Sequence, residues 1–366
     1  MAPESTTEKA PPLPQGTLVQ RGLIWSRKNL FSSPFNTVLT LFCLWLIYET
    51  VPAIISWALL DAVWVGDPQA CREGSGACWA LVHDKLRLIL FGTYPFDEQW
   101  RPLLAIVVLL GTVGVSLHKA FWKAWLPLMW GVNTAIIGIL MWGGLFGLTY
   151  VENSLWGGLP LTLMLAVIGT VAAFPLGLVL ALGRQSDLPI IKVMSVAYIE
   201  LIRGVPLITV LFMASVMFPL FLPEGVTVDK LLRAQVGIIL FTAAYLAEVF
   251  RGGLQAIPRG QFEAADSLAL TYWQSMRMII LPQALRLVIP PTVNSFISMF
   301  KDTSLVIIIG LFDLLGTVKL ALKDPPWSPF YMEGYIFAAA VFFVFCYSMA
   351  RYSAYLEKDL RKGERK

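Results

Sequence analysis

Polar and ionisable side chains interrupt several of the most apolar stretches of this sequence. Glu248 is the one charge between positions 234 and 250, and Asn294, Ser298 and Asp302 recur at four-residue intervals, so a helix would carry these three on one face. Ionisable groups in lipid are expensive and usually functional, because they can hold a charged solute or pair with a neighbouring helix. We therefore predict a pathway for a polar solute, lined by Glu248, Asn294, Ser298, Lys301, Asp302 and Arg203.

The same residues also have structural interpretations, and the sequence leaves these open. Glu248 can pair with Arg251, three positions further on, and so mark the end of a helix. Arg203 can extend to the membrane surface beside Gly204. The stripe of Asn294, Ser298 and Asp302 can serve only to hydrogen-bond one helix to another.

A second feature is the segment at about 258–282, which is too long for a simple turn and too apolar for a solvated linker. Residues 261–268 have the pattern of a short amphipathic helix. Thr271 and Gln274 have the spacing of a capping box, which would start a second helix that ends near Pro282. Two such helices form a compact knob that presents Glu263 beside small alanines. Its expected apolar anchors are Phe262, Leu268, Trp273 and Met276.

The composition places all of these residues in an all-α membrane protein. The 366 residues are 57% hydrophobic and 14% charged, with a mean hydropathy of +0.68, which a soluble domain of this size could not sustain. The length criterion gives about eight membrane spans, at 36–60, 102–120, 125–150, 159–183, 203–222, 235–256, 284–311 and 334–356. The seventh span contains Pro290 and Pro291, so we expect a kinked or broken helix there.

The distribution of basic residues predicts the orientation of these spans. Lys and Arg are more frequent in the loops that lie on the same side as the N-terminus, so both termini are expected in the cytoplasm. The net charge of +4 follows from this topology and gives no reason to expect nucleic-acid binding. Residues 1–35 are expected to form a disordered cytoplasmic tail, 36–152 a three-span extension with an external loop, and 153–366 a five-span core.

The sequence offers few residues for covalent or metal chemistry. Cys71 and Cys78 flank a polar turn and are candidates for a disulfide in an external compartment, although two free thiols are equally compatible with the spacing. The sequence contains no Gly-x-x-x-x-Gly-Lys-Ser/Thr phosphate loop, and His83 and His118 are its only histidines. We therefore expect no catalytic residues, no metal and no cofactor, and any ATP must be hydrolysed by another protein.

The knob segment carries a family resemblance. Glu263-Ala264-Ala265, then Ala269, then Ile279-Ile280-Leu281-Pro282, resembles the EAA loop of ATP-binding-cassette (ABC) importer permeases, whose pattern is EAA, three residues, Gly, nine residues and I-x-L-P. The family glycine is Ala269 here, which costs of order 1 kcal/mol if the turn needs a positive φ. Segments 198–206, 244–252, 281–286 and 301–305 look like the polar amino-acid branch of that family, and the three extra spans are similar to the larger permease subunit of general L-amino-acid uptake systems.

This resemblance implies a permease for amino acids in a bacterial inner membrane, without enzymatic activity of its own. The implied partners are a cytoplasmic ABC ATPase in two copies, a second homologous permease, a periplasmic amino-acid-binding protein and membrane lipid. The ATPase would dock through Glu263, Ala264, Ala265, Ala269 and Pro282. A secondary transporter would need inverted repeats, and a membrane enzyme would need a nucleophile and base, neither of which is visible in the sequence.

The resemblance also suggests how the polar residues would be used. If spans 235–256 and 284–311 pack side by side, Glu248 would face the ammonium group of a zwitterion, while Asn294, Ser298 and Lys301 would face its carboxylate. All four are then expected in one cavity. Asp302 is expected to restrain Lys301.

Overall fold

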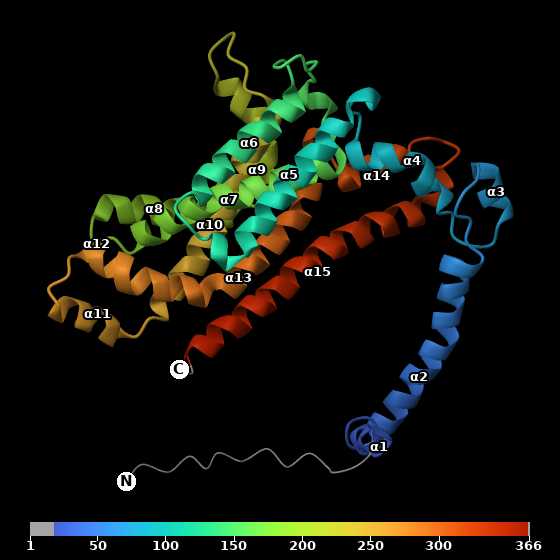
Figure 1. Cartoon of the computed structure of the whole chain (residues 1–366), viewed down its shortest axis with the longest axis horizontal. Helices are drawn as coiled ribbons and strands as arrows, with labels where there is room; N and C mark the ends of the chain where they lie inside the picture. The colour runs from blue at the N-terminus through green and yellow to red at the C-terminus, as the bar shows by residue number, and fades with distance from the viewer. Residues whose placement is uncertain (1–17, 365–366) are drawn as a thin grey trace. The chain divides into compact units, whose positions relative to one another are not determined.

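The computed structural model describes residues 18–364, and it confirms the all-α membrane protein (Figure 1). Strand structure within this range is limited to β1 (Phe312–Asp313) and to isolated bridges. Two of these bridges pair β1 with Gly157 and Gly158, which lie at the start of α7 (Gly158–Arg184). Asp313 is buried there and accepts a hydrogen bond from the Gly316 amide, and burial raises the pKa of its carboxyl to about 6.

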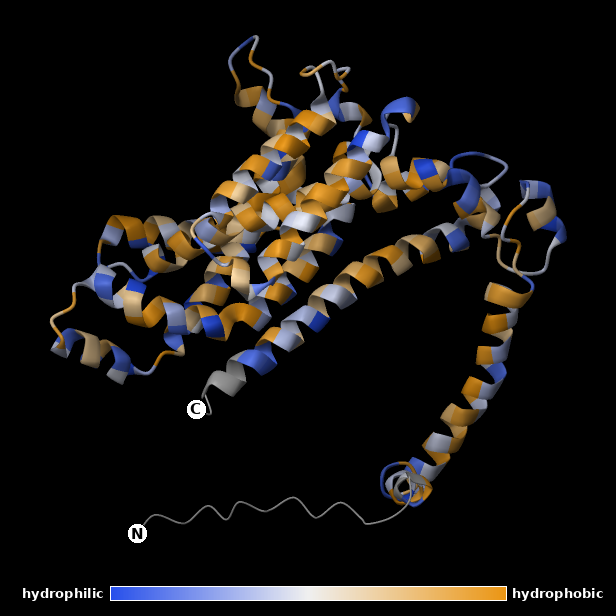
Figure 2. Cartoon of the chain, viewed as in Figure 1, coloured by the Kyte–Doolittle hydropathy of each residue, from blue (hydrophilic) through white to orange (hydrophobic). Residues whose placement is uncertain are grey.

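The chain divides into two compact units, residues 1–79 and 80–366. The first holds α1 (Leu18–Asn29), α2 (Pro34–Ile55), a π turn (Ser56–Leu60) and α3 (Pro68–Glu73). Ser33 caps α2 by accepting a hydrogen bond from the Asn36 amide. No side chain of α2 is buried, and the helix is hydrophobic all round, as expected of a span surrounded by lipid (Figure 2).

The predicted disordered tail is wrong for residues 18–29, which are helical. Val19 and Leu23 lie four residues apart and give this segment a helical apolar pattern that the proline-rich residues before it lack. Residues 1–17 lie outside the described range.

The second unit contains the remaining helices. They are α4 (Ala80–Phe91), α5 (Trp100–Leu117), α6 (Leu126–Trp142), α7 (Gly158–Arg184), α8 (Pro189–Arg203), α9 (Leu207–Phe212), α10 (Lys230–Gln255), α11 (Arg259–Ser267), α12 (Tyr272–Ser275), α13 (Leu281–Asp302), α14 (Leu314–Ala321) and α15 (Tyr331–Glu364). Short 3-10 or π turns occupy Phe96–Glu98, Lys119–Phe121, Asn153–Leu155, Met213–Met217, Phe218–Phe221, Met276–Ile280, Thr303–Ile309 and Ser328–Phe330.

Six helical segments in the described range are long and apolar enough to cross a membrane, and all six match predicted spans. The other two predicted spans differ. The run at 125–150 yields only the 17-residue α6, because Gly143 and Gly144 adopt positive φ and end the helix. The run at 203–222 is the second half of a broken pair, α8 and α9, which bend by 103° at Gly204-Val205-Pro206.

The predicted end of a helix at Pro282 is wrong, and of the two alternatives predicted at Pro290-Pro291, a break does not occur, because both prolines lie inside α13. The helical segment runs from Tyr272 to Ile309 over 38 residues. Pro282 lies in the first turn of α13, directly after the π turn at Met276–Ile280. That wider turn changes the local bonding pattern where proline provides no amide donor.

The expected division near residue 152 does not coincide with a boundary between compact units, because α4 packs on α7 and α14 and the Thr317 hydroxyl donates to the Ile89 carbonyl at 2.7 Å. A buried arginine organises the segment before residue 152. Arg101 at the start of α5 has no exposed surface, and its Nε donates to the Leu140 carbonyl at 2.6 Å, near the C-terminus of α6. The Nη1 atom of Arg101 donates to the Thr149 carbonyl at 2.9 Å. Nearby, the Tyr94 hydroxyl donates to the Met141 carbonyl at 3.0 Å. Burial raises the pKa of Tyr94 to about 12. These donors satisfy carbonyls that a helix end leaves free, and thereby join residues 94–149 to one another within the larger unit.

The core of the second unit is the contact of α7 with α10. A Cβ at Gly177 would stand 2.8 Å from the Leu246 Cβ and 3.0 Å from the Ala243 carbonyl oxygen, so only glycine permits this separation. Small residues at such a crossing are typical of helix packing in lipid. Helix α13 packs on α10, and α15 packs on the other side of α13.

The turn between α11 and α12 has the positive φ at Ala269 that the sequence analysis considered. Ala269 has φ 53°, in the left-handed region, and the Leu270 amide donates back to the Ala265 carbonyl at 3.2 Å, which is a Schellman ending. The alanine therefore carries a backbone strain of order 1 kcal/mol that the family glycine would avoid. The predicted capping box of Thr271 and Gln274 is confirmed.

We expect Ala269→Gly to stabilise this turn by up to about 1 kcal/mol, because glycine adopts the positive φ without steric conflict. Hydrogen exchange of amides 259–275 in the purified protein should slow. Ala264→Gly, on the exposed side of α11, is the matched control and should speed exchange, since glycine destabilises a helix interior. Faster exchange in both variants would contradict the strained turn.

Cys71 and Cys78 form a disulfide with a Cα–Cα distance of 5.4 Å, and both cysteines are buried. Mass spectrometry of the denatured, non-reduced protein should therefore find these two thiols protected from alkylation until a reductant is added. Cys43, a free thiol in α2, is the internal control and should be alkylated without a reductant once denaturation exposes it to water. Alkylation of Cys71 and Cys78 without reduction would exclude the bond in the native protein.

Candidate functional site

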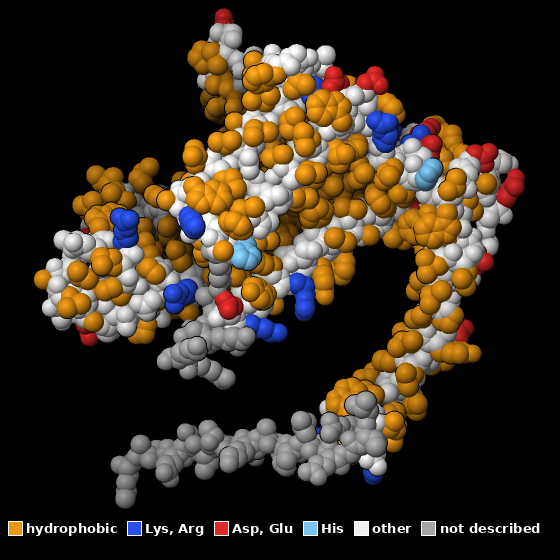
Figure 3. Space-filling model, in the orientation of Figure 1, with side chains coloured by type: hydrophobic (Ala, Val, Ile, Leu, Met, Phe, Trp, Pro, Cys, Tyr) orange, Lys and Arg blue, Asp and Glu red, His pale blue; other side chains and the backbone are white. Residues whose placement is uncertain are grey.

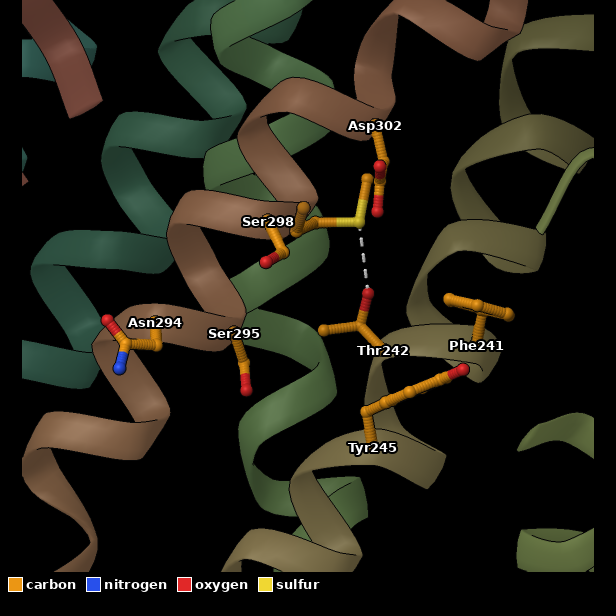
Figure 4. Close-up of a pocket in the computed structure, with 8 residues that line it drawn as sticks. Phe241, Thr242, Tyr245, Asn294, Ser295, Ser298 and Asp302 are labelled. Atoms are coloured by element: carbon orange, nitrogen blue, oxygen red, sulfur yellow. Dashed lines mark hydrogen bonds between the residues drawn. The ribbon is translucent and has the colours of Figure 1, made fainter. Parts of the chain in front are cut away.

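A cavity of about 330 Å³ lies between α10 and α13 (Figure 4). Helix α13 contributes Asn294, Ser298 and Asp302, which were predicted to share one face. The lining is completed by residues that the sequence analysis did not single out, namely Phe241, Thr242, Tyr245, Ser295 and Met299. The first three of these lie at i, i+1 and i+4 on α10, a spacing that could have identified a face but that apolar runs produce equally often.

The cavity combines aromatic, hydroxyl and carboxyl groups. The ring centroids of Phe241 and Tyr245 are 4.8 Å apart, and the Thr242 hydroxyl lies 3.1 Å from the Met299 sulfur across the helix contact. Asp302 is half-buried, so its carboxylate keeps access to the cavity. An aromatic face and a carboxylate both attract ammonium groups, and the amide and hydroxyls of Asn294 and Ser298 can donate to an anion.

Glu248 is not among the residues that line this cavity, so its predicted place there is wrong. Its side chain is 14% exposed and pairs with the guanidinium groups of Arg184 at 2.7 Å, Arg251 at 2.8 Å and Arg203 at 3.5 Å. Arg184 also pairs with Glu200 at 2.9 Å. These five residues are called the arginine cluster below. The structural interpretation, in which Glu248 pairs with Arg251, is therefore confirmed.

The arginine cluster joins the ends of three helices, since Arg184 ends α7, Arg203 ends α8 and Glu248 lies in the last turns of α10. Arg203 also stands over the ring of Tyr245, with its guanidinium carbon 5.6 Å from the ring centroid. Because Tyr245 lines the cavity, Arg203 contacts the wall of the cavity and does not itself line it.

Lys301 is likewise not among the residues that line this cavity. Consecutive helical residues point about 100° apart, and Lys301 lines a second cavity, bordered by α14 and α15, while Asp302 faces the first. The two side chains therefore line different cavities, and the expectation that Asp302 restrains Lys301 stays a prediction.

The knob of α11 and α12 presents Glu263 and Ala264 on its exposed surface, while Ala265 is fully buried beneath them. Two of the four expected anchors are exposed, Leu268 at 70% and Trp273 at 68%. The other two are not available: Met276 is buried and Phe262 packs against the same core. Gln283 on α13 donates to Gln261 on α11 at 3.0 Å and so ties the knob to the long helix.

The surroundings of these sites match a membrane component. Apolar side chains are spread over the visible helical surface in Figure 3, whereas Lys, Arg, Asp and Glu appear there in small groups. Within residues 18–364, no group of three or more His, Cys, Asp and Glu side chains is arranged to hold a metal ion.

Comparison with known proteins places this architecture. The family model described as binding-protein-dependent transport system inner membrane component matches residues 173–362. The chain is 52% identical over 360 residues to the inner membrane amino-acid ABC transporter permease protein YhdY of Escherichia coli, covering 96% of this chain and 97% of that protein. It is 40% identical to the glutamate/glutamine/aspartate/asparagine transport system permease protein BztC of Rhodobacter capsulatus, with 98% of each chain covered.

Among solved structures, the crystal structure of an amino acid ABC transporter with histidines matches with a TM-score of 0.50 and 32% identity. The match covers 55% of this chain and 92% of the other. The resemblance read from the EAA-type segment is confirmed by these findings. The chain belongs to the family of binding-protein-dependent transport system inner membrane components.

Proposed function

We propose that this chain is the permease subunit of an ATP-driven importer that carries amino acids across the bacterial inner membrane. The observation that carries the proposal is the EAA-type segment, which forms an exposed knob on a protein with 52% identity to an amino-acid permease. The chain itself is not an enzyme. A cytoplasmic ABC ATPase in two copies, a second homologous permease and a periplasmic binding protein complete the system, with both termini in the cytoplasm.

Coupling follows from the continuity of one helical segment. The stretch from Tyr272 to Ile309 begins in the knob and carries Asn294, Ser298 and Asp302 near its other end. When the ATPase pair closes, it moves the knob, and this segment transmits the displacement to the wall of the cavity. Alternating access then requires no chemistry in the permease, only a change in how α13 packs on α10.

The cavity accepts a zwitterion by dividing its two charges. Asp302 and the rings of Phe241 and Tyr245 receive the ammonium group, while Asn294 and Ser298 donate to the carboxylate. Unmet charges would otherwise oppose entry, because dehydration of a zwitterion is costly. Glu248 is neutralised by arginines and does not bind the substrate.

We expect Glu263→Lys to abolish transport while leaving the protein inserted, because it reverses charge on the exposed knob and touches no membrane-facing helix. The measurement is substrate-stimulated ATPase activity of the reconstituted complex. Glu224→Lys, the same reversal on the exposed loop between α9 and α10, controls for the change in net charge. Normal stimulation in Glu263→Lys would remove the coupling role.

Asp302→Asn should weaken uptake by the equivalent of about 1–3 kcal/mol, the usual effect of losing one charged hydrogen-bonding partner, while resting ATPase activity persists. Uptake is measured at increasing substrate concentration with the binding protein in excess, so that weaker binding in the cavity appears as a shift to higher substrate concentration. Glu248→Gln is the comparison: it leaves arginines without their carboxylate, so it should mainly reduce the amount of folded protein and shift the concentration dependence of the remainder less than Asp302→Asn does. A larger shift in Glu248→Gln than in Asp302→Asn would indicate instead that Glu248 binds the substrate.

A further inference from the structure

The cavity that Lys301 lines is a groove of about 350 Å³ on the side of α13 that faces α15. Its apolar walls include Ala338, Ala339 and Phe342 of α15, and its polar groups are Lys301, Ser304 and Tyr335. The proposed substrate cavity on the α10 side shares none of these residues. Binding of substrate in that cavity therefore does not explain the presence of Lys301.

Lys301 is exposed, and within residues 18–364 its ammonium group takes part in no ion pair, whereas Glu248 is fully paired in the same bundle. A cation in a membrane-spanning segment needs either an anion or a path to the headgroup region. Tyr335 lies four residues into α15, about 6 Å from its beginning at about 1.5 Å per residue. The polar end of the groove is therefore close to a membrane surface, and in the proposed orientation this is the outer one.

We propose that this groove binds one phospholipid with an anionic headgroup, whose phosphate pairs with Lys301 and whose acyl chain lies against Ala339 and Phe342. Charge complementarity identifies the headgroup, because the lysine supplies a positive charge that forms no ion pair with an acid of residues 18–364. The apolar walls of the groove indicate that its occupant carries an acyl chain. The small side chains of Ala338 and Ala339 leave the depth that an acyl chain needs.

Binding is tested on the full chain in its native complex, held in nanodiscs of equal phosphatidylglycerol and phosphatidylethanolamine and then released for native mass spectrometry. The wild type should retain one phosphatidylglycerol per copy in preference to phosphatidylethanolamine. Lys301→Gln should lower its occupancy about tenfold, the effect of losing one hydrogen bond to a charged group, and Lys301→Arg should restore it. Ala339→Phe should exclude the lipid by filling the groove.

Two matched variants separate the groove from general effects. Lys323→Gln removes an exposed lysine elsewhere, and Ala340→Phe enlarges the neighbouring exposed residue of α15, which does not line the groove. Both should keep the lipid. Retention of phosphatidylglycerol by Lys301→Gln and Ala339→Phe would overturn the proposal.

The competing occupant is a polypeptide, and a photoreactive phenylalanine analogue at position 339 distinguishes it. Cross-linking in membranes should add the mass of a phospholipid to the chain. A cross-link to another permease subunit, or to a second segment of this chain, would overturn the lipid assignment. Neither assay depends on substrate, so the proposed transport function and the lipid site can fail separately.

Discussion

An ionised group in a membrane-spanning segment must be neutralised, and this constraint explains where the charged side chains of the protein lie. Glu248 meets three arginines, which brings together the ends of α7, α8 and α10. Arg101 satisfies free carbonyls near the end of α6 and thereby holds α5 against it. Both sets of polar contacts hold helix ends together, in addition to the apolar packing of the helices. Asp302 and Lys301 differ from these residues, because each lines a cavity.

The consequence for function is a division of labour between two faces of α13. On the α10 face, polar groups remain free to bind a solute, because the carboxylate of Asp302 is not engaged by the arginine cluster. The aromatic wall connects the two sites, since Tyr245 lines the cavity and also lies beneath Arg203. A rearrangement of the arginine cluster would therefore move one wall of the cavity, and the position of α8 and the shape of the cavity are physically linked.

The sequence predicted the knob well and the cavity only in part. The capping box and the strained alanine could be foreseen because both depend on local backbone chemistry at fixed spacing. The grouping of Glu248 with Lys301 failed because helical pattern gives a face but not the neighbour that the face meets. Lys301 and Asp302 are adjacent in sequence and line separate cavities. The burial of Met276 and the shortness of α6 likewise depend on tertiary contacts and on two glycines whose φ no apolar window detects.

The prolines show why the long helical segment can transmit movement. Pro290 and Pro291 lie inside α13 without ending it, and the one local departure from α-helical bonding near Pro282 is the π turn at Met276–Ile280. A π turn interrupts the α-helical bonding pattern, and such turns are frequent at functional sites. It lies between the knob and the cavity-lining residues, and the buried Met276 and Ile280 hold it in the core formed by α7 and α10. Displacement of the knob must therefore either rotate the whole segment or repack this turn, and both outcomes alter the contact of α13 with α10 that encloses the cavity.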